Sequence, residues 1–145
     1  MQIKDVLLNK TRALHTIRPD HRVADAIERL SQHNIGSLPV LERNGELVGI
    51  FSERDVLIGV HDHGVAFREM KVGDVMTPDP VTCDVYDDVH RAMGKMTEHR
   101  IGQLPVLDED RRVVGVVSVG DLIKLLYERV EAENKHLLNY LYGPG

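Results

Sequence analysis

The sequence predicts a mixed α/β (α+β) fold built from two tandem β-α-β-β-α units. Three observations predict it: an internal repeat, an apolar periodicity that changes between helix and strand spacing within each copy, and turn residues between the pieces. In a chain of 145 residues, two units of this size cannot each build a deep core. We therefore expect the two units to share one core.

The internal repeat emerges when the chain is shifted by 66 positions, which aligns residues 16–59 with residues 82–125 without a gap. Fourteen of the 44 aligned pairs are identical, among them Ile35/Ile101, Gly36/Gly102, Leu38/Leu104, Pro39/Pro105, Ser52/Ser118 and Asp55/Asp121. A weaker echo, residues 4–7 against residues 73–76, precedes the copies with a length difference of three residues. Such a period indicates one structural unit that is used twice.

Each copy begins with a short extended piece, around residues 15–17 and 81–83, and continues as an amphipathic helix. The apolar face of this helix has three- and four-residue spacing in both copies. Its members are Val23, Ala26, Ile27 and Leu30 in the first copy, and Val89, Ala92, Met93 and Met96 in the second. Gly36 and Gly102 are predicted to stop the two helices.

The apolar segments 38–41 and 47–51 predict a β-hairpin. Asn44-Gly45 lies between them, and this pair suits a tight primed turn. The second copy carries Asp110-Arg111 at that place, so we expect a different turn there. Ser52 and Ser118 then open a second helix in each copy.

These patterns divide the chain into four parts. Repeat 1 with its lead-in takes residues 1–61, a linker takes 62–75, repeat 2 takes 76–127, and a helical extension takes 128–145. A partial apolar stripe runs along the last helix, formed by Leu122, Leu126, Val130, Leu137 and Leu141. Charge around Glu131 and Glu133 interrupts the stripe, and two uses for the helix stay open: capping the core or contacting a second copy.

Composition excludes several classes of protein. The net charge is −5 and the chain has no run of Lys and Arg, which argues against a nucleic-acid partner because phosphate neutralisation dominates such binding. The single cysteine, Cys83, cannot form an internal disulfide and fits a reducing, cytoplasmic setting. The N-terminal segment lacks a signal-peptide stretch and no apolar run reaches membrane-spanning length, so we expect no membrane association.

Two seven-residue segments carry the strongest chemical signal: residues 49–55, GIFSERD, and residues 115–121, GVVSVGD. In each, a buried strand ends in a Ser at a helix N-cap, with an Asp three residues on. Free amides at a helix start suit a phosphate, the Ser hydroxyl can bond it, and the Asp carboxylate can accept two ribose hydroxyls. The alternative is a capping box, in which the Asp only bonds the backbone of the Ser. Recurrence of the whole pattern favours the binding interpretation.

The combination Ile-Gly-x-Leu-Pro-Val, a short spacer and Val-Gly-apolar-apolar-Ser-x-x-Asp resembles the hallmark of CBS (cystathionine-β-synthase) domains. The segment Asp74-Val75-Met76-Thr77 before Pro80-Val81-Thr82 is similar to the usual entry into such a repeat. The resemblance covers nearly the whole chain apart from about the last twenty residues. It implies two CBS repeats packed sheet to sheet with pseudo-two-fold symmetry, which is a stand-alone Bateman module.

The resemblance also implies a function. Such modules bind AMP, ADP or ATP, and in some members S-adenosylmethionine, in two clefts, as a ligand and not as a required cofactor. They dimerise into a flat disc and transmit a conformational change to a regulated protein, here unknown. Carried over to this sequence, Asp55 and Asp121 would contact the ribose and Ser52 and Ser118 the phosphates. The remaining positions would lie near the base: Thr16 and Thr82 on the first strands, and the slots formed by Gly36, Leu38, Pro39 and by Gly102, Leu104, Pro105.

The two sites differ in charge. Arg54 precedes the first Asp and is expected to pair with a phosphate, whereas Gly120 stands at that place in the second copy. Charge in the second site would then come from Arg100 or Lys124, because an anion in an acidic protein needs cationic partners.

Weaker signals favour structural roles. His61-Asp62-His63 contains metal-ligand types, but zinc needs three or four converging ligands and a solvated loop explains the pattern, so we assign no metal. Cys83 is expected to be a buried small apolar side chain, and His33 and His99 suit helix C-termini. No motif for catalysis is present, and we expect no enzyme. The alternatives to a nucleotide sensor are a ligand-independent scaffold dimer and a metal-linked CBS protein.

Overall fold

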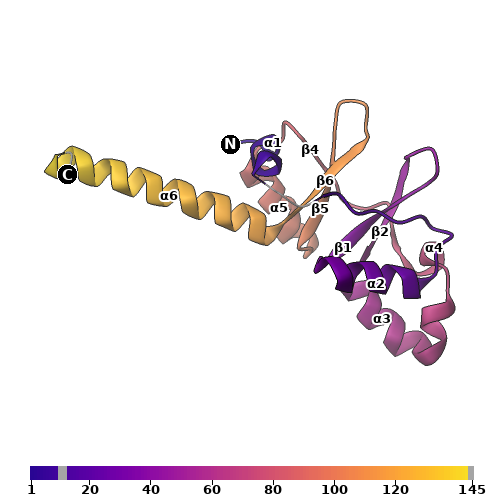
Figure 1. Ribbon diagram of the computed structural model, residues 1–145. Helices are drawn as coiled ribbons and strands as arrows, with labels where there is room; N and C mark the ends of the chain where they lie inside the picture. Colours follow the sequence, from indigo (N-terminus) through magenta and orange to yellow (C-terminus); the bar gives the residue numbers. More distant parts are fainter. Residues whose placement is uncertain (10–12, 144–145) are drawn as a thin grey trace.

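Two small three-stranded sheets lie side by side at the centre of the protein, with helices on their outer sides (Figure 1). The computed structural model describes residues 1–9 and 13–143. The first sheet has the order β1 (Ser37–Leu41), β2 (Leu47–Ser52), β3 (Thr77–Pro78), and the second has the order β4 (Cys83–Asp84), β5 (Gln103–Leu107), β6 (Val113–Ser118). The helices are α1 (Ile3–Leu8), α2 (Val23–His33), α3 (Glu53–His63), the 3-10 helix η1 (Gly64–Glu69), α4 (Val72–Val75), α5 (Val89–His99) and α6 (Val119–Tyr142).

The 66-residue repeat holds at the level of strand register. Leu38 pairs with Phe51 in the first hairpin, and Leu104 pairs with Val117 in the second. The first strand of each unit runs parallel to the hairpin: it is a single bridge from Ile17 in copy 1 and a two-residue strand, β4, in copy 2. The predicted α/β fold of two tandem β-α-β-β-α units is therefore confirmed.

The prediction for the hairpin turns is wrong. Both hairpins close in the same way: Gly45 N donates to Glu42 O at 2.9 Å, and Arg111 N donates to Asp108 O at 3.0 Å. Gly45 and Arg111 have positive φ, 89° and 62°, while Asn44 does not. Both primed turn types need positive φ at the first central residue, which would be Asn44. Each turn is instead an ordinary turn followed by a single left-handed residue. Arg111 takes this conformation without being a glycine.

The predicted helix stops are also wrong. The left-handed residue that ends α2 is Asn34, with φ 51°, and the one that ends α5 is Arg100, with φ 54°. Gly36 and Gly102 lie two residues further along. Their carbonyls accept the first amides of α3 and α6, at 3.1 and 2.8 Å. These glycines therefore join the entry of each hairpin to the start of the helix that follows it.

Two buried clusters replace the single shared core that we expected, and each is completed by a segment from outside its own repeat. The first lobe is the β1–β3 sheet with α2, α3, η1 and α4, and its cluster includes Phe67 and Val72 from the segment between the repeats. The second lobe is the β4–β6 sheet with α5, the start of α6, and α1. Ile3 and Val6 of α1 are buried in this second cluster, beside Cys83. The lead-in of repeat 1 thus packs in the core of repeat 2.

Equivalent backbone hydrogen bonds hold the two exchanged segments. Ile3 N donates to Asp87 O at 2.9 Å, and the counterpart Val72 N donates to His21 O at 2.8 Å. A second equivalent pair follows. Lys4 N donates to the carbonyl of residue 85 at 2.8 Å, and the amide of residue 73 donates to the carbonyl of Pro19 at 2.9 Å. The weak echo of residues 4–7 in residues 73–76 therefore marks one structural element used in both lobes.

The last helix, α6, extends far from the lobes (Figure 1). Leu122 and Leu125 in its first turns are buried in the second lobe, whereas every residue from 127 to 142 is exposed. Among the described residues, no helix is long and apolar enough to cross a bilayer.

Candidate ligand-binding cleft

A cavity of about 660 Å³ lies between the two repeats. Its walls come from α1, from the entry to β1, from β5 and β6, and from the first turns of α6. The lining residues are Val6, Asn9, Gly36, Ser37, Gln103, Val116, Ser118, Gly120, Asp121, Lys124, Leu125 and Glu128. The volume lies within the range of small-molecule sites.

Ser118 and Asp121 meet the cavity at the start of α6. Ser118 is the N-cap, and its hydroxyl accepts the amide of Asp121 at 3.1 Å. In return Asp121 Oδ2 accepts the amide of Ser118 at 2.8 Å. The first amide, that of Val119, donates to Gly102 O, so not all the amides that we expected for a phosphate are available. The sequence left capping and ligand contact as alternatives for this Asp. In the structure Asp121 forms the capping box and also lines the cavity.

The equivalent pair in the first repeat lies outside the cavity and bonds a residue of a neighbouring strand. Asp55 is buried, and its Oδ2 accepts the amide of Ser52 at 2.8 Å and the Ser52 hydroxyl at 3.1 Å. Its Oδ1 accepts the hydroxyl of Thr77 at 2.9 Å. Thr77 belongs to β3, so this bond joins the helix start to the third strand of the sheet. Neither Ser52, Asp55 nor the exposed Arg54 lines the 660 Å³ cavity.

Ser37 lines the cavity although the sequence patterns did not point to it. Only 4% of it is exposed, and its hydroxyl is the one buried side-chain polar atom in the described part of the chain without a hydrogen-bond partner. A buried hydroxyl without a partner is costly, by about 1–3 kcal/mol, and this one lines the cavity. Gln103, its counterpart 66 residues on, lines the same cavity, and its side chain occupies the space that a Cβ at Gly36 would need. A polar residue inside the apolar Gly-x-Leu-Pro-Val segment is the signal that could have identified both.

The remaining predicted positions do not line this cavity. Leu38 and Leu104 are fully buried in the two clusters. The Pro39 carbonyl accepts the amide of Ile17, and the Pro105 carbonyl accepts the weak Sγ bond of Cys83. These residues therefore serve the cores of the lobes in the structure.

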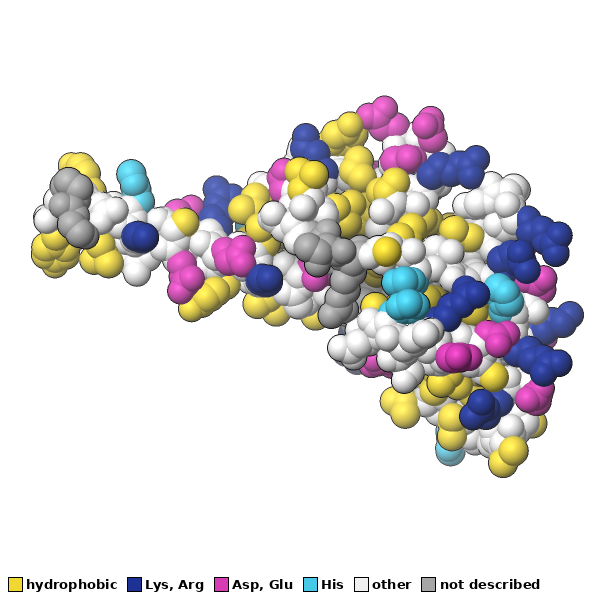
Figure 2. All heavy atoms as spheres, viewed as in Figure 1, with side chains coloured by type: hydrophobic (Ala, Val, Ile, Leu, Met, Phe, Trp, Pro, Cys, Tyr) yellow, Lys and Arg dark blue, Asp and Glu magenta, His cyan; other side chains and the backbone are white. Residues whose placement is uncertain are grey.

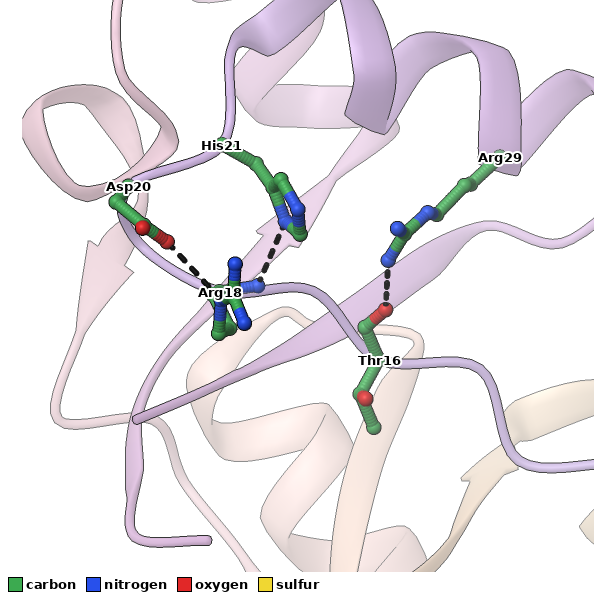
Figure 3. A network of polar contacts seen from close by, with 5 residues as sticks. All are labelled: Thr16, Arg18, Asp20, His21 and Arg29. Atoms are coloured by element: carbon green, nitrogen blue, oxygen red, sulfur yellow. Dashed lines mark hydrogen bonds and ion pairs between the residues drawn. The ribbon is translucent and has the colours of Figure 1, made fainter. Parts of the chain in front are cut away.

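Thr16 and Thr82 are held by a basic side chain in each repeat. Arg29 Nη1 donates to the carbonyl of Thr16 at 2.6 Å, and Lys95 Nζ donates to that of Thr82 at 2.7 Å. Figure 3 shows the side chain of Thr16 directed away from Arg29. Arg29 and Lys95 are again 66 residues apart, so both repeats position their lead-in strand in this way.

Other titratable groups have structural surroundings. Cys83 is buried, as expected, and burial raises the pKa of its thiol to about 12. His15 stacks on His33 with ring centroids 3.6 Å apart, and burial together with the positive potential of His33 lowers the pKa of His15. Within residues 1–9 and 13–143, no group of three or more His, Cys, Asp and Glu side chains converges as a metal site would require.

Known proteins share this architecture. The CBS domain-containing protein CBSX3, mitochondrial, of Arabidopsis thaliana is 35% identical over 128 residues, which are 86% of this chain and 62% of that protein. The chain therefore spans less than two thirds of that relative. The crystal structure of the CBS-domain containing protein ATU1752 from Agrobacterium tumefaciens has a TM-score of 0.81 at 34% identity, covering 86% of this chain and 98% of that one.

Two similar structures contain ligands. The CBS domain pair of protein MJ0100, in complex with 5′-methylthioadenosine and S-adenosyl-L-methionine, has a TM-score of 0.78 at 26% identity and covers 89% of this chain and 98% of that one. CBSX2 in complex with AMP has a TM-score of 0.73 at 27% identity and covers 88% of this chain and 96% of that one. The family description "CBS domain" matches residues 3–62 and 72–128. With two such matches, a cleft between the repeats and the two Ser-x-x-Asp helix starts, this chain belongs to the CBS domain family as a pair of CBS domains.

Proposed function

We propose that this protein is a ligand-sensing regulatory module that binds an adenosine-type nucleotide in the cavity between its repeats. The single observation that carries the proposal is a cavity of about 660 Å³ at which the helix start Ser118–Asp121 meets the buried, unpartnered hydroxyl of Ser37. The AMP complex of CBSX2 and the adenosyl complexes of the MJ0100 pair support this class of ligand.

The ribose and the phosphate of a nucleoside monophosphate each have a chemical counterpart in the cavity. The Asp121 carboxylate accepts ribose hydroxyls in addition to the Ser118 amide, because a carboxylate offers about four acceptor sites. The start of α6 attracts the phosphate through the positive end of the helix dipole. The Ser37 hydroxyl bonds a polar group of the ligand and thereby removes its own desolvation cost.

The charge of the lining favours AMP over ATP. Lys124 is the one cation among the lining residues that the structure describes, and Asp121 and Glu128 are acidic. A triphosphate in a net-acidic protein needs several cationic partners to offset its charge. We therefore infer the affinity order AMP, ADP, ATP for this cavity.

The second repeat supplies the site that we propose as dominant. Asp121 lines the cavity, whereas Asp55 does not, and one oxygen of Asp55 accepts the hydroxyl of Thr77. A ribose at Asp55 would have to displace the Thr77 hydroxyl. The other family positions, Thr16, Leu38, Pro39, Ser52, Arg54 in the first repeat and Thr82, Gly102, Leu104, Pro105 in the second, remain proposed contacts.

The role of the whole protein follows from the module. We propose a homodimer without catalytic activity of its own, in a reducing cytoplasmic setting, that changes its contact with a regulated protein when the ligand binds. The relative CBSX3 carries "mitochondrial" in its name, so fractionation of the native cell tests the setting. The effect on the partner is limited by the differential affinity of the ligand for the two shapes of the module.

Calorimetry with AMP, ADP, ATP, NADH and S-adenosylmethionine tests the proposal. We expect Asp121→Ala to weaken AMP binding about ten- to hundredfold, which corresponds to hydrogen bonds to a charged acceptor worth about 1.5–3 kcal/mol. Asp55→Ala is the matched control, because it also removes a capping box but not a lining residue. Absence of binding below millimolar, or equal affinity in Asp121→Ala and wild type, contradicts the proposal.

The completed capping boxes at both helix starts favour one second candidate, a ligand-independent scaffold dimer. In that case the Ser-x-x-Asp pattern only stabilises the helices. Purified protein that carries no nucleotide, and whose unfolding temperature is unchanged by each of these nucleotides, would support the scaffold.

A further inference from the structure

The outer part of α6 is an amphipathic helix whose apolar side is exposed. Figure 2 shows yellow apolar side chains along the projecting rod, between blue and magenta ones. The core-facing residues Leu122 and Leu125 lie on a different side, buried in the second lobe. The apolar residues on the free side are between 53% and 62% exposed; they are Ile123, Tyr127, Val130, Leu137 and Leu141.

With Asn134, these residues follow the spacing of a coiled coil. Positions 123, 127, 130, 134, 137 and 141 alternate in steps of four and three, which is the a/d pattern of a heptad repeat. Tyr127, Asn134 and Leu141 occupy a positions, and Ile123, Val130 and Leu137 occupy d positions. The six layers span about 27 Å of helix at 1.5 Å per residue. We define these six residues as the α6 seam.

We propose that the α6 seam pairs with the same seam of a second copy of this chain to form a parallel, two-stranded coiled coil. This goes beyond the proposed ligand site and does not depend on it.

Asn134 points to the parallel orientation. It is the one polar residue in the seam, and it occupies an a position. In a parallel pair it faces Asn134 of the second copy, and two amides can hydrogen-bond each other; a single Asn at a specifies register and two strands in this way. In an antiparallel pair whose seams overlap fully, residue 123 faces residue 141 and residue 127 faces residue 137 of the second copy. Asn134 would then face Val130. The two Asn134 side chains would then be buried without a hydrogen bond to each other, which costs free energy.

The charges beside the seam point the same way. Glu131 occupies an e position and Glu133 a g position. In the parallel pair, g residues face e residues of the other helix, so Leu126 faces Glu131 and Glu133 faces Leu138, with no like charges opposed. In the antiparallel pair, e faces e and g faces g, so each of these glutamates would face its own copy. Like charges at close range are destabilising. Charge thus favours the parallel pair over the antiparallel one.

The residues on the far side of α6 agree with this geometry. Arg129, Ala132, Lys135, His136 and Asn139 occupy b, c and f positions and are polar or small. Arg129 also forms an i,i+4 ion pair with Glu133 at 3.3 Å, on the solvent flank of the helix. The interruption by Glu131 and Glu133 therefore lies beside the seam and not within it.

Sedimentation of the full chain tests the interface. Val130→Glu with Leu137→Glu places charge in two d layers, and we expect dimerisation at least tenfold weaker than in wild type. Ala132→Glu with Asn139→Glu adds the same charge at f positions of the same helix and is the matched control, with wild-type dimerisation expected. Equal dimer affinity in the d variant and wild type overturns the proposal, as does a wild-type protein that is monomeric throughout.

Disulfide trapping tests the orientation. Cys83 is buried and does not compete, so a single added cysteine reports the pairing. Leu137→Cys is expected to cross-link efficiently, and Ala132→Cys at an f position is not. In the antiparallel pair, residues 137 of the two copies would lie about 15 Å apart along the axis, too far for a disulfide. Cross-linking of Leu137→Cys only when it is mixed with Tyr127→Cys overturns the parallel arrangement.

Discussion

The exchange of α1 into the second lobe makes a quantitative prediction for Ile3→Ala. Ile3 is fully buried in the cluster that contains Cys83, although it precedes repeat 1 in the chain. The substitution removes three carbons, worth about 0.8 kcal/mol each or about 2.4 kcal/mol in transfer free energy. The cavity that remains adds a further cost. We expect a loss of about 3–4 kcal/mol in the free energy of unfolding.

Urea unfolding followed by circular dichroism measures this loss, and thiol labelling locates it. The native Cys83 thiol reacts only after the second lobe opens, because it is buried and its pKa is raised to about 12. Ile3→Ala should therefore accelerate Cys83 labelling about a hundredfold or more, since each 1.4 kcal/mol corresponds to a factor of ten. Leu8→Ala, in the same helix but 82% exposed, should change neither measurement.

Val72→Ala provides the comparison between lobes. Val72 holds the equivalent place in the first lobe and is also fully buried. This variant should be destabilised by about 2 kcal/mol. For each kcal/mol of lost stability, it should accelerate Cys83 labelling less than Ile3→Ala does. The reasoning is refuted if Ile3→Ala leaves both the stability and the labelling rate at the wild-type values.

Three further predictions concern single positions. Gly59→Ala should destabilise the first lobe by about 1–3 kcal/mol, measured by urea unfolding, because a Cβ there would overlap the ring of the buried Phe67; wild-type stability would contradict the packing. His15 has a lowered pKa in the folded state, first from burial and then from His33, so the unfolded state binds protons more readily and stability should fall as the pH drops below about 6.5. His15→Gln should flatten that pH dependence of the unfolding temperature, and an unchanged slope would refute the assignment. Asn134→Leu should strengthen self-association and admit species larger than dimers, visible by light scattering; weaker association would contradict the seam.

Local sequence determined the repeated unit. The pairs Leu38/Leu104 and Ser52/Ser118 identified a 66-residue period, and the strand registers reproduce it. Apolar spacing identified the buried faces of α2 and α5, because a side chain that must avoid water leaves its period in the sequence wherever it packs. The capping boxes at Ser52 and Ser118 were also legible, since a cap involves residues only three apart.

The tertiary structure decided which segments those buried faces meet. The weak echo of residues 4–7 in residues 73–76 relates two segments of the sequence but does not show in which lobe either one packs, and only the fold places Ile3 and Val6 beside Cys83. The turns at Gly45 and Arg111 follow a bulge that both hairpins share, so the hairpin geometry overrode the local preference of Asn44. The two segments share the same Ser-x-x-Asp pattern in the sequence. In the structure, however, Asp55 accepts the hydroxyl of Thr77, whereas Asp121 lines the cavity together with Ser37. Such differences arise from contacts between residues far apart in the chain, and a local pattern carries no record of them.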